Sequence, residues 1–409
     1  MHIEKGTFVQ NFKDLPGNIN ARTISAGVLS GFFTLTTVLI LIGAGAEAHL
    51  DPRILISWGF SAYFLAGLTG FVLATIYRQP MPGAWSIPGV ALVLVGLKTF
   101  SFPEMVGAYL VANLMVALIG FSGLMGRLIR AIPLPIVLAM LVGVLIDFGV
   151  GIFRSVAAAP LLAGTAVATY LVISSMRIKN TLPPVIVALC VAAGVAQLTG
   201  QIQFEGIGPT GLTLPSFWLP EFSLTAVVSV SIPLALLVLC GEMPKAAGVL
   251  LSQGYNPPVN AMTAYCGIAG VLGSFFGAVN VNIAGPVTAI CASPDAGPKE
   301  GRYASVLIAS LFLVVLGITA GIAVPFIVAL PLPLINAIAG LAMLPVLLGS
   351  LQSTFLAKRF QTGSFFSLVI AMSGVTLLGV AAPVWALVGG VVVSFFVERD
   401  DFRTASSEA

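Results

Sequence analysis

The chain alternates between long apolar runs and short segments rich in proline, glycine or charge. Most runs are long enough to cross a hydrocarbon core of about 30 Å as α-helices. They lack the alternation of apolar and polar residues, over about ten residues, that is typical of an outer-membrane barrel. The sequence contains 58% hydrophobic and 8% charged residues, whereas about a quarter of the residues of a soluble domain are charged. We therefore predict an all-α polytopic membrane protein.

The apolar runs divide into two sets of seven. The first set comprises residues 23–46, 54–77, 82–97, 104–126, 134–152, 157–176 and 182–200. The second set comprises residues 222–250, 259–280, 282–293, 303–325, 332–356, 362–381 and 383–397. An odd number of spans in one copy places the next copy upside down in the membrane. We expect 14 transmembrane segments arranged as two inverted repeats, residues 23–200 and 222–397, joined by a loop at 201–221.

Segments 3 and 10, residues 82–97 and 282–293, are interrupted by proline and glycine and occupy corresponding positions in the two repeats. Three pairs of prolines share one and the same spacing along the chain, namely Pro88 with Pro286, Pro133 with Pro331 and Pro135 with Pro333. Broken segments at matching positions of two repeats indicate the substrate site of a transporter. We expect both segments to be extended at first and to become half-helices near the middle of the membrane.

Positive charges indicate the orientation of the chain, whose net charge is only +3. With a cytoplasmic N-terminus, 14 basic residues fall on the cytoplasmic side, namely Lys5, Lys13, Arg22, Arg78, Arg127, Arg130, Arg177, Lys179, Lys299, Arg302, Lys358, Arg359, Arg399 and Arg403. The outer side receives Arg53, Lys98 and Arg154. Lys and Arg concentrate on the cytoplasmic side of bacterial-type inner membranes. We therefore expect cytoplasmic tails at 1–22 and 398–409, and an outer location for the loop at 201–221, which lacks Lys and Arg.

The two half-helices predict an anion site. A helix N-terminus carries unpaired N–H donors and roughly half a positive charge, so it binds an anion without a fixed cation. The residues expected at the site are Trp85, Ser86, Pro88, Gly89, Asn280, Asn282, Ala284, Gly285 and Thr288. Structural alternatives stay open for several of them. Trp85 and Thr288 would then pack between helices, Ser86 would cap its half-helix, and the two asparagines would satisfy freed backbone groups.

Two acidic residues lie inside predicted spans, where a carboxylate is costly and marks a functional hypothesis. Glu242 is deep in the eighth segment, and burial there would let it load and release a proton. The alternative is an internal ion pair with Lys245, three residues later and helped by a kink at Pro244, which would keep the acid charged. Asp147 is nearer the outer end of the fifth segment, within reach of water or Arg154.

No motif for catalysis or nucleotide binding is present: G-x-x-x-x-G-K-[ST], H-E-x-x-H and G-x-S-x-G are all missing from the sequence. An enzyme is therefore the least favoured class, and neither a cofactor nor a metal is expected. Uphill transport by this chain would be driven by an ion gradient. The expected partners are a small-molecule substrate, protons and membrane lipid, without nucleic acid, and a homo-oligomer stays open.

Four strings carry a family resemblance: AWSIPGVAL at 84–92, GLMGRLIRAIP at 123–133, GYNPPV at 254–259 and NIAGPVTAICASPDA at 282–296. They resemble the benzoate/proton symporter family, BenE. The resemblance implies a fold similar to that of the uracil/xanthine permeases, with a core domain of segments 1–4 and 8–11 and a gate domain of segments 5–7 and 12–14. It also implies proton-coupled uptake of benzoate or a related aromatic carboxylate.

Two other functions stay open. The resemblance implies an amide at the position of Glu242, and an acid there is instead similar to the nucleobase permeases, so a nucleobase/proton symporter on the same fold is one alternative. An anion channel or uniporter that uses the same facing helix N-termini is the other.

Overall fold

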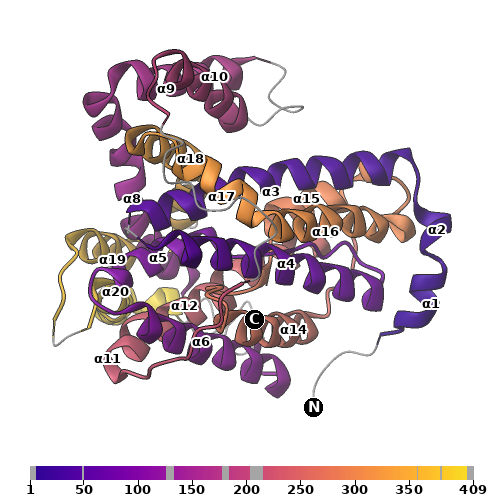
Figure 1. Ribbon diagram of the computed structural model, residues 1–409. Coiled ribbons are helices and arrows are strands. Elements are labelled where there is room, and N and C mark those ends of the chain that lie inside the picture. The colour runs from indigo at the N-terminus through magenta and orange to yellow at the C-terminus, as the bar shows by residue number, and fades with distance from the viewer. Residues whose placement is uncertain are drawn as a thin grey trace.

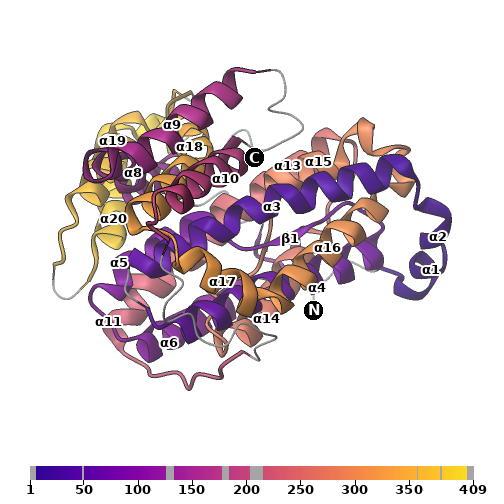
Figure 2. The same cartoon turned by 45° about the horizontal axis from the view of Figure 1, so that its top comes forward.

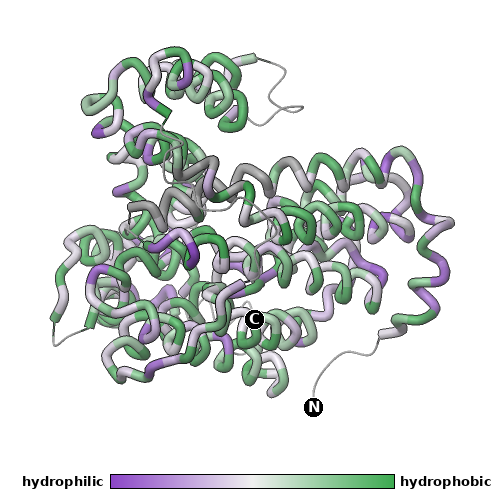
Figure 3. The backbone as a smooth tube through the Cα atoms, in the orientation of Figure 1, coloured by the Kyte–Doolittle hydropathy of each residue, from purple (hydrophilic) through white to green (hydrophobic). Residues whose placement is uncertain are grey.

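The computed structural model describes residues 6–47, 50–125, 133–176, 184–202, 215–356, 358–377 and 380–402, and within them the chain is mostly helical (Figure 1). Six basic residues of the orientation argument, Lys5, Arg127, Arg130, Arg177, Lys179 and Arg403, lie outside the described residues, as do positions 203–214 of the connecting loop. Hydrophobic residues dominate most helices, and polar residues gather towards the end formed by the first two short helices (Figure 3).

The first half of the chain contains α1 (Phe8–Lys13), α2 (Leu15–Asn18), α3 (Ala21–Glu47), α4 (Pro52–Tyr77), β1 (Gly83–Ala84), α5 (Ile87–Leu97), α6 (Phe102–Ser122), α8 (Leu134–Ala158), α9 (Pro160–Ser175) and α10 (Pro184–Leu198). The second half begins with a nearly continuous helix made of α11 (Leu224–Ala226), η2 (Val227–Ser231), α12 (Ile232–Leu236), η3 (Leu237–Glu242) and α13 (Met243–Ser252). It continues with α14 (Val259–Ser274), β2 (Asn282–Ile283), α15 (Gly285–Ala292), η4 (Pro294–Ala296), η5 (Lys299–Gly301), α16 (Tyr303–Ile318), α17 (Ala320–Val328), α18 (Leu332–Leu356), α19 (Gln361–Ser373) and α20 (Ala382–Val397).

Among the described residues, six helices are long and apolar enough to span a membrane: Pro52–Tyr77, Phe102–Ser122, Leu134–Ala158, Leu224–Ser252, Lys299–Ile318 and Leu332–Leu356. Four shorter apolar helices, Ile87–Leu97, Pro160–Ser175, Pro184–Leu198 and Ala382–Val397, coincide with other predicted segments. The predicted segment 303–325 is divided between α16 and α17. The segment at 362–381 ends as a helix at Ser373, because Gly374 has φ 64° and closes it in the left-handed conformation.

The spacing that relates the three proline pairs recurs in the helices. α5 and α15 begin at Ile87 and Gly285, and these starts show this spacing. α8 and α18 begin at Leu134 and Leu332, which show the same spacing. The two halves of the chain therefore place several helices in the same register.

Two π-helical turns precede the prolines of the eighth segment. η2 ends at Ser231, two residues before Pro233, and η3 ends at Glu242, two residues before Pro244. Proline lacks an N–H, and its ring collides with the carbonyl four residues earlier in a regular helix. A wider turn relieves this collision, so the prolines account for both π-helical segments. The structure thus has a local π-helical distortion where the sequence predicts a kink at Pro244.

Small residues bring α6 and α14 into close contact. A Cβ at Gly120 would overlap backbone atoms of Ala264, and a Cβ at Gly267 would overlap backbone atoms of Ala117. Asn113 of α6 bridges the pair, since its amide donates to the Ser274 hydroxyl at 3.2 Å and to the Val279 carbonyl at 2.9 Å. Small residues and bridging polar side chains are the usual means by which membrane helices associate.

Two groups of helices are visible in both views. α3, α4 and α16 lie together with α14 and α6, whereas α8 packs against α18 and α19, with α20 beside α19 (Figures 1 and 2). α9 and α10 pack on each other and against α18, at the top of Figure 1. α5 contacts members of both groups, α3 and α8, and therefore lies where the groups meet.

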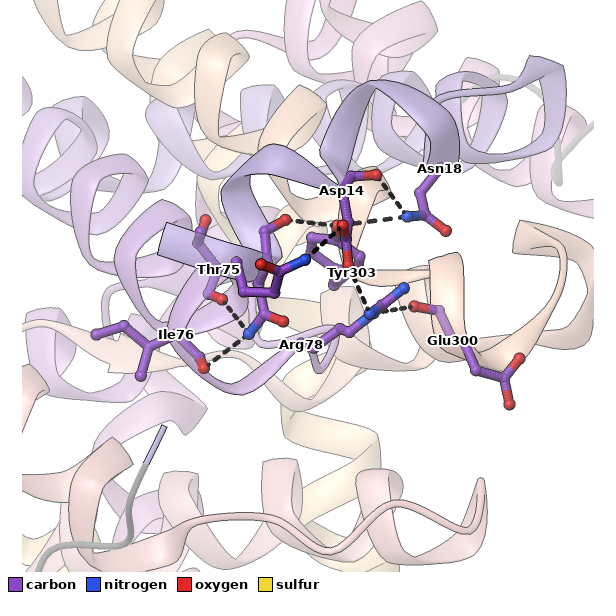
Figure 4. A network of polar contacts seen from close by, with 9 residues as sticks. Asp14, Asn18, Thr75, Ile76, Arg78, Glu300 and Tyr303 are labelled. Carbon is purple, nitrogen blue, oxygen red and sulfur yellow. Dashed lines mark hydrogen bonds and ion pairs between the residues drawn. The ribbon is translucent and has the colours of Figure 1, made fainter. Parts of the chain in front are cut away.

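The two short N-terminal helices are docked on the ends of α4 and α16 (Figure 4). The Asn11 amide donates to the carbonyl of Thr75 at 2.9 Å, and the Tyr303 hydroxyl donates to the carbonyl of Asn11 at 2.9 Å. Arg78 forms an ion pair with Asp14 at 3.1 Å and lies over the ring of Tyr303. Part of the segment expected as an N-terminal tail is thus tied to the helices of the first group.

We expect Gly267→Ala to lower the free energy of unfolding by about 1–3 kcal/mol, because the added methyl forces α6 and α14 apart. Gly164→Ala on α9 is the matched control, since a Cβ there meets no atom within 4 Å. The control protein should be unchanged or slightly more stable, because alanine is the better helix former. Thermal unfolding in detergent measures both, and equal midpoints for the two variants would contradict the close packing of α6 and α14.

Candidate functional site

The two broken segments meet in a two-stranded antiparallel sheet. Gly83 of β1 is paired with Ile283 of β2, and Ala84 is paired with Asn282. Each strand is followed within three residues by a helix, α5 or α15, so both segments divide into a strand and a half-helix as the sequence predicts. Figure 2 shows β1 near the middle of the molecule. A Cβ at Gly83 would overlap the carbonyl oxygen of Ala66 on α4, so only glycine allows this strand to approach α4 so closely.

The first half-helix begins with a side-chain cap. Ser86, which is buried, accepts a hydrogen bond on its hydroxyl from the Gly89 N–H at 3.1 Å, and Pro88 lies in the first turn, where its missing N–H has no cost. The Ser86 N–H donates to the side-chain oxygen of Asn280 at 3.0 Å. Asn280 therefore joins the approach to β2 with the start of α5.

The second half-helix, α15, has no such cap. Its N-cap residue is Ala284, which offers no side-chain acceptor, and Pro286 lies in its first turn. The Thr288 hydroxyl donates to the Ala284 carbonyl at 2.7 Å, within the helix. The start of α15 thus carries the positive end of a helix dipole without a side chain that neutralises it.

Asn282 is the most exceptional side chain of the site. It is buried, and within the described part of the chain neither its amide nitrogen nor its amide oxygen has a hydrogen-bond partner. The amide nitrogen of Asn280 also lacks one. An unpaired buried polar group typically costs about 1–3 kcal/mol, so such groups call for a specific explanation. Within the described residues, three side-chain atoms of Asn280 and Asn282 are therefore buried without a hydrogen-bond partner.

Trp85 lies between the strand and the half-helix and is buried. Its ring packs edge-on against Tyr63 of α4 at 6.1 Å between centroids, and the Tyr63 hydroxyl shares a 3.0 Å hydrogen bond with Thr37 of α3. These contacts hold the Trp85 ring in place next to Ser86. Sequence reasoning did not identify Tyr63, which has no local pattern that links it to the site.

The segment that carries Glu242 and Lys245 lies next to α15. α13 packs on α15 and touches β2, and a Cβ at Gly285 would lie 3.3 Å from the Cβ of Lys245. Glu242 is partly buried at the end of η3. Within the described residues, its carboxylate and the Lys245 ammonium form no ion pair within 4.0 Å. The sequence predicts Lys245 only as a partner of Glu242. Its position beside α15 is visible only in the structure.

Asp147 is not part of this arrangement. It is exposed on α8, where it lines a separate cavity with Lys98 and Arg154. Among the described residues, no cluster of three His, Cys, Asp or Glu side chains is arranged to hold a metal ion.

Comparison with known proteins gives consistent results. Residues 17–396 match the BenE family, described as benzoate membrane transport protein. Inner membrane protein YdcO of Escherichia coli K12 is 29% identical over 388 residues, which cover 93% of this chain and 98% of that protein. The benzoate membrane transport protein of Acinetobacter baylyi is 28% identical over 365 residues, which cover 88% of this chain and 91% of that protein.

Solved structures share the fold at low sequence identity. The transmembrane domain of the cyanobacterial bicarbonate transporter BicA aligns with a TM-score of 0.65 at 15% identity, covering 95% of this chain and 100% of that domain. SLC26A9 aligns with a TM-score of 0.66 at 13% identity, covering 95% of this chain and 67% of that one. These similarities show that the chain shares the fold of these two proteins.

We expect Asn282→Leu to leave the free energy of unfolding unchanged or to raise it by about 1 kcal/mol, because the substitution removes two unpaired buried polar atoms. Asn113→Leu is the matched control. Its amide makes three hydrogen bonds, so its loss should lower stability by about 1–3 kcal/mol. Thermal unfolding without added ligand compares the two, and a larger loss for Asn282→Leu would mean that Asn282 holds the fold together and is not reserved for a ligand.

Proposed function

Because this chain belongs to the BenE family of benzoate membrane transport proteins, we propose that it takes up benzoate or a related aromatic carboxylate together with a proton. The family match confirms the resemblance drawn from the four sequence strings, and with it the membership of a transporter family rather than an enzyme family. The chain is a multi-pass protein, and its similarity to an inner membrane protein assigns it to that membrane.

One observation supports the proposal: β1 and β2, which directly precede the half-helices α5 and α15, pair with each other, and within the described residues the buried Asn282 amide of β2 has no hydrogen-bond partner. Backbone that is neither helix nor closed barrel persists within a membrane only when it is buried in protein or lines a cavity. In transporters this arrangement is used to bind substrate. A carboxylate matches it, because each oxygen accepts hydrogen bonds from N–H donors and the two helix dipoles favour a negative charge.

We assign the parts of the substrate as follows. The carboxylate would lie between the starts of α5 and α15, with the Asn280 and Asn282 amides as further donors. The aromatic ring would lie along Trp85, whose face is fixed by Tyr63. Ser86 would act chiefly as a cap, since its hydroxyl already accepts from Gly89, while it can still donate its own hydrogen to a ligand oxygen.

Glu242 is the proposed proton carrier. It lies on the segment that packs against β2 and α15, and it is not tied to Lys245 by an ion pair within the described residues. A protonated Glu242 would leave the Lys245 charge available to the substrate anion, whereas a charged Glu242 would compensate it. Proton release and substrate release would then be coupled by electrostatics.

The proposal includes the finer architecture. Helices that begin at one constant spacing, at Ile87 and Gly285 and again at Leu134 and Leu332, support two inverted seven-segment repeats. The two groups of helices would act as a core domain, with the half-helices, and a gate domain against which the core moves. The charge bias supports cytoplasmic N- and C-termini.

Two alternatives make different predictions for the same protein. A nucleobase/proton symporter is favoured by the acid at Glu242, and competition by uracil or xanthine against benzoate separates it from the main proposal. An anion uniporter would use the same helix N-termini without Glu242, and its uptake would follow the membrane potential alone.

In proteoliposomes, we expect labelled benzoate to accumulate above its external concentration only when the outside is more acidic than the inside, because the proton gradient supplies the driving force. Accumulation should collapse when a protonophore is added. Protein-free liposomes are the control for passive entry of the neutral acid, and a non-aromatic carboxylate such as acetate is the specificity control. Facilitated uptake of benzoate that is the same with and without the gradient would eliminate the coupling, and no facilitated uptake at all would eliminate benzoate as the substrate.

We expect Glu242→Gln to abolish gradient-driven accumulation while benzoate exchange across the membrane continues, because the amide preserves shape but cannot carry a proton. Glu300→Gln is the control, since that side chain is exposed and away from the half-helices. Counterflow and gradient-driven uptake are measured on both variants. Normal accumulation by Glu242→Gln would exclude this residue as the carrier.

A further inference from the structure

A cavity of about 350 Å³ lies between the second half of α5, the C-terminal half of α8 and the first two turns of α18. It falls between the two groups of helices, since α5 contacts the first group while α8 and α18 belong to the second. Its volume is within the range of small-molecule pockets, about 300–1,000 Å³. None of the residues proposed for the half-helix site lines this cavity, and none of the roles proposed above uses the cavity.

Charged groups surround the cavity and leave a positive excess. Lys98, the C-cap residue of α5, and Arg154, near the end of α8, contribute two cations, and Asp147 contributes one anion. Within the described residues, Asp147 forms no ion pair within 4.0 Å with either cation. The cavity also borders the electropositive start of α18 and the electronegative C-terminal ends of α5 and α8, so the positive excess rests on the Lys98 and Arg154 side chains.

The remaining wall is suited to a flat apolar group. Leu94, Val95 and Phe148 line it, and Asn336 contributes a side-chain amide. An apolar pocket with a few converging polar groups is the usual form of a small-molecule site. The combination of a net positive charge, an amide and an aromatic wall matches a small aromatic anion.

We propose that this cavity is a second, lower-affinity binding site for the aromatic carboxylate, which collects the anion before it reaches the half-helices. The identity of the ligand rests on the proposed function. α5 links the two sites, since Ala91 borders the cavity and lies five residues after Ser86, a rise of about 7.5 Å along the helix. With the orientation proposed from the charge bias, Lys98 and Arg154 make this the outer access route.

A purely structural role would have a different signature. Both cations lie near the C-termini of their helices, where positive charge stabilises the helix dipole. Removing either one would then lower stability and leave the concentration dependence of uptake unchanged.

The first test is the kinetics of benzoate uptake by Lys98→Gln and Arg154→Gln. At low ionic strength each should raise KM about threefold to fivefold with the maximal rate unchanged, and Asp147→Asn should lower KM. The shifts should shrink at about 1 M salt, where charges are screened over a few ångströms. Arg53→Gln is the matched control, because Arg53 is exposed on the same proposed side and does not line the cavity. An unchanged KM for both cavity variants, or equal shifts for Arg53→Gln, would overturn the proposal.

The second test does not depend on benzoate transport. Asn336→Cys is made together with Cys190→Ser, which removes the exposed native thiol. An anionic methanethiosulfonate should label Cys at this position severalfold faster than a cationic one relative to their rates with a free thiol, and Lys98→Gln should remove the preference. Equal relative rates would overturn the anion site. A preference that persists in a protein without benzoate uptake would instead retain the anion site and refute the proposed substrate.

Discussion

The structure depends on the pairing of two very short strands inside a membrane protein. The hydrocarbon core of a membrane contains no water that could hydrogen-bond a free backbone N–H or carbonyl. An interrupted helix must therefore form these hydrogen bonds within the protein. Here the two interruptions satisfy one another, with Gly83 opposite Ile283 and Ala84 opposite Asn282. Each broken segment is therefore tolerated because the other is present, although the two are encoded in opposite halves of the chain.

Several other features follow from this pairing. Glycine is required at position 83, because β1 must approach the backbone of α4 closely enough to reach β2. Asn280 extends the connection by accepting from the first residue before α5. Each paired strand leads directly into a half-helix, whose N-terminus favours a negative charge without a dedicated arginine. A structural solution to a backbone problem thus creates the chemistry on which the proposed function is based.

Unmet hydrogen bonds distinguish the site from the rest of the core. Asn113 and Asn282 are both buried amides. Among the residues that the structure describes, the Asn113 side chain makes three hydrogen bonds and the Asn282 side chain makes none. Their sequence contexts do not reveal this difference, since both lie in apolar surroundings. The positions of neighbouring carbonyls and hydroxyls, which only the tertiary structure gives, decide whether a buried amide has hydrogen-bond partners.

The sequence by itself determined the helical membrane class, the approximate segment positions, the two interruptions and the constant spacing of prolines that recurs in the helix starts. These properties depend on local hydrophobicity and on proline and glycine, whose backbone effects act over a few residues. The tertiary structure alone decided that the interruptions pair as strands, that Tyr63 supports Trp85, that Lys245 lies beside Gly285 and that Asp147 belongs to a different cavity. Such contacts join residues far apart in the chain, and they arise from helix packing that no local pattern encodes.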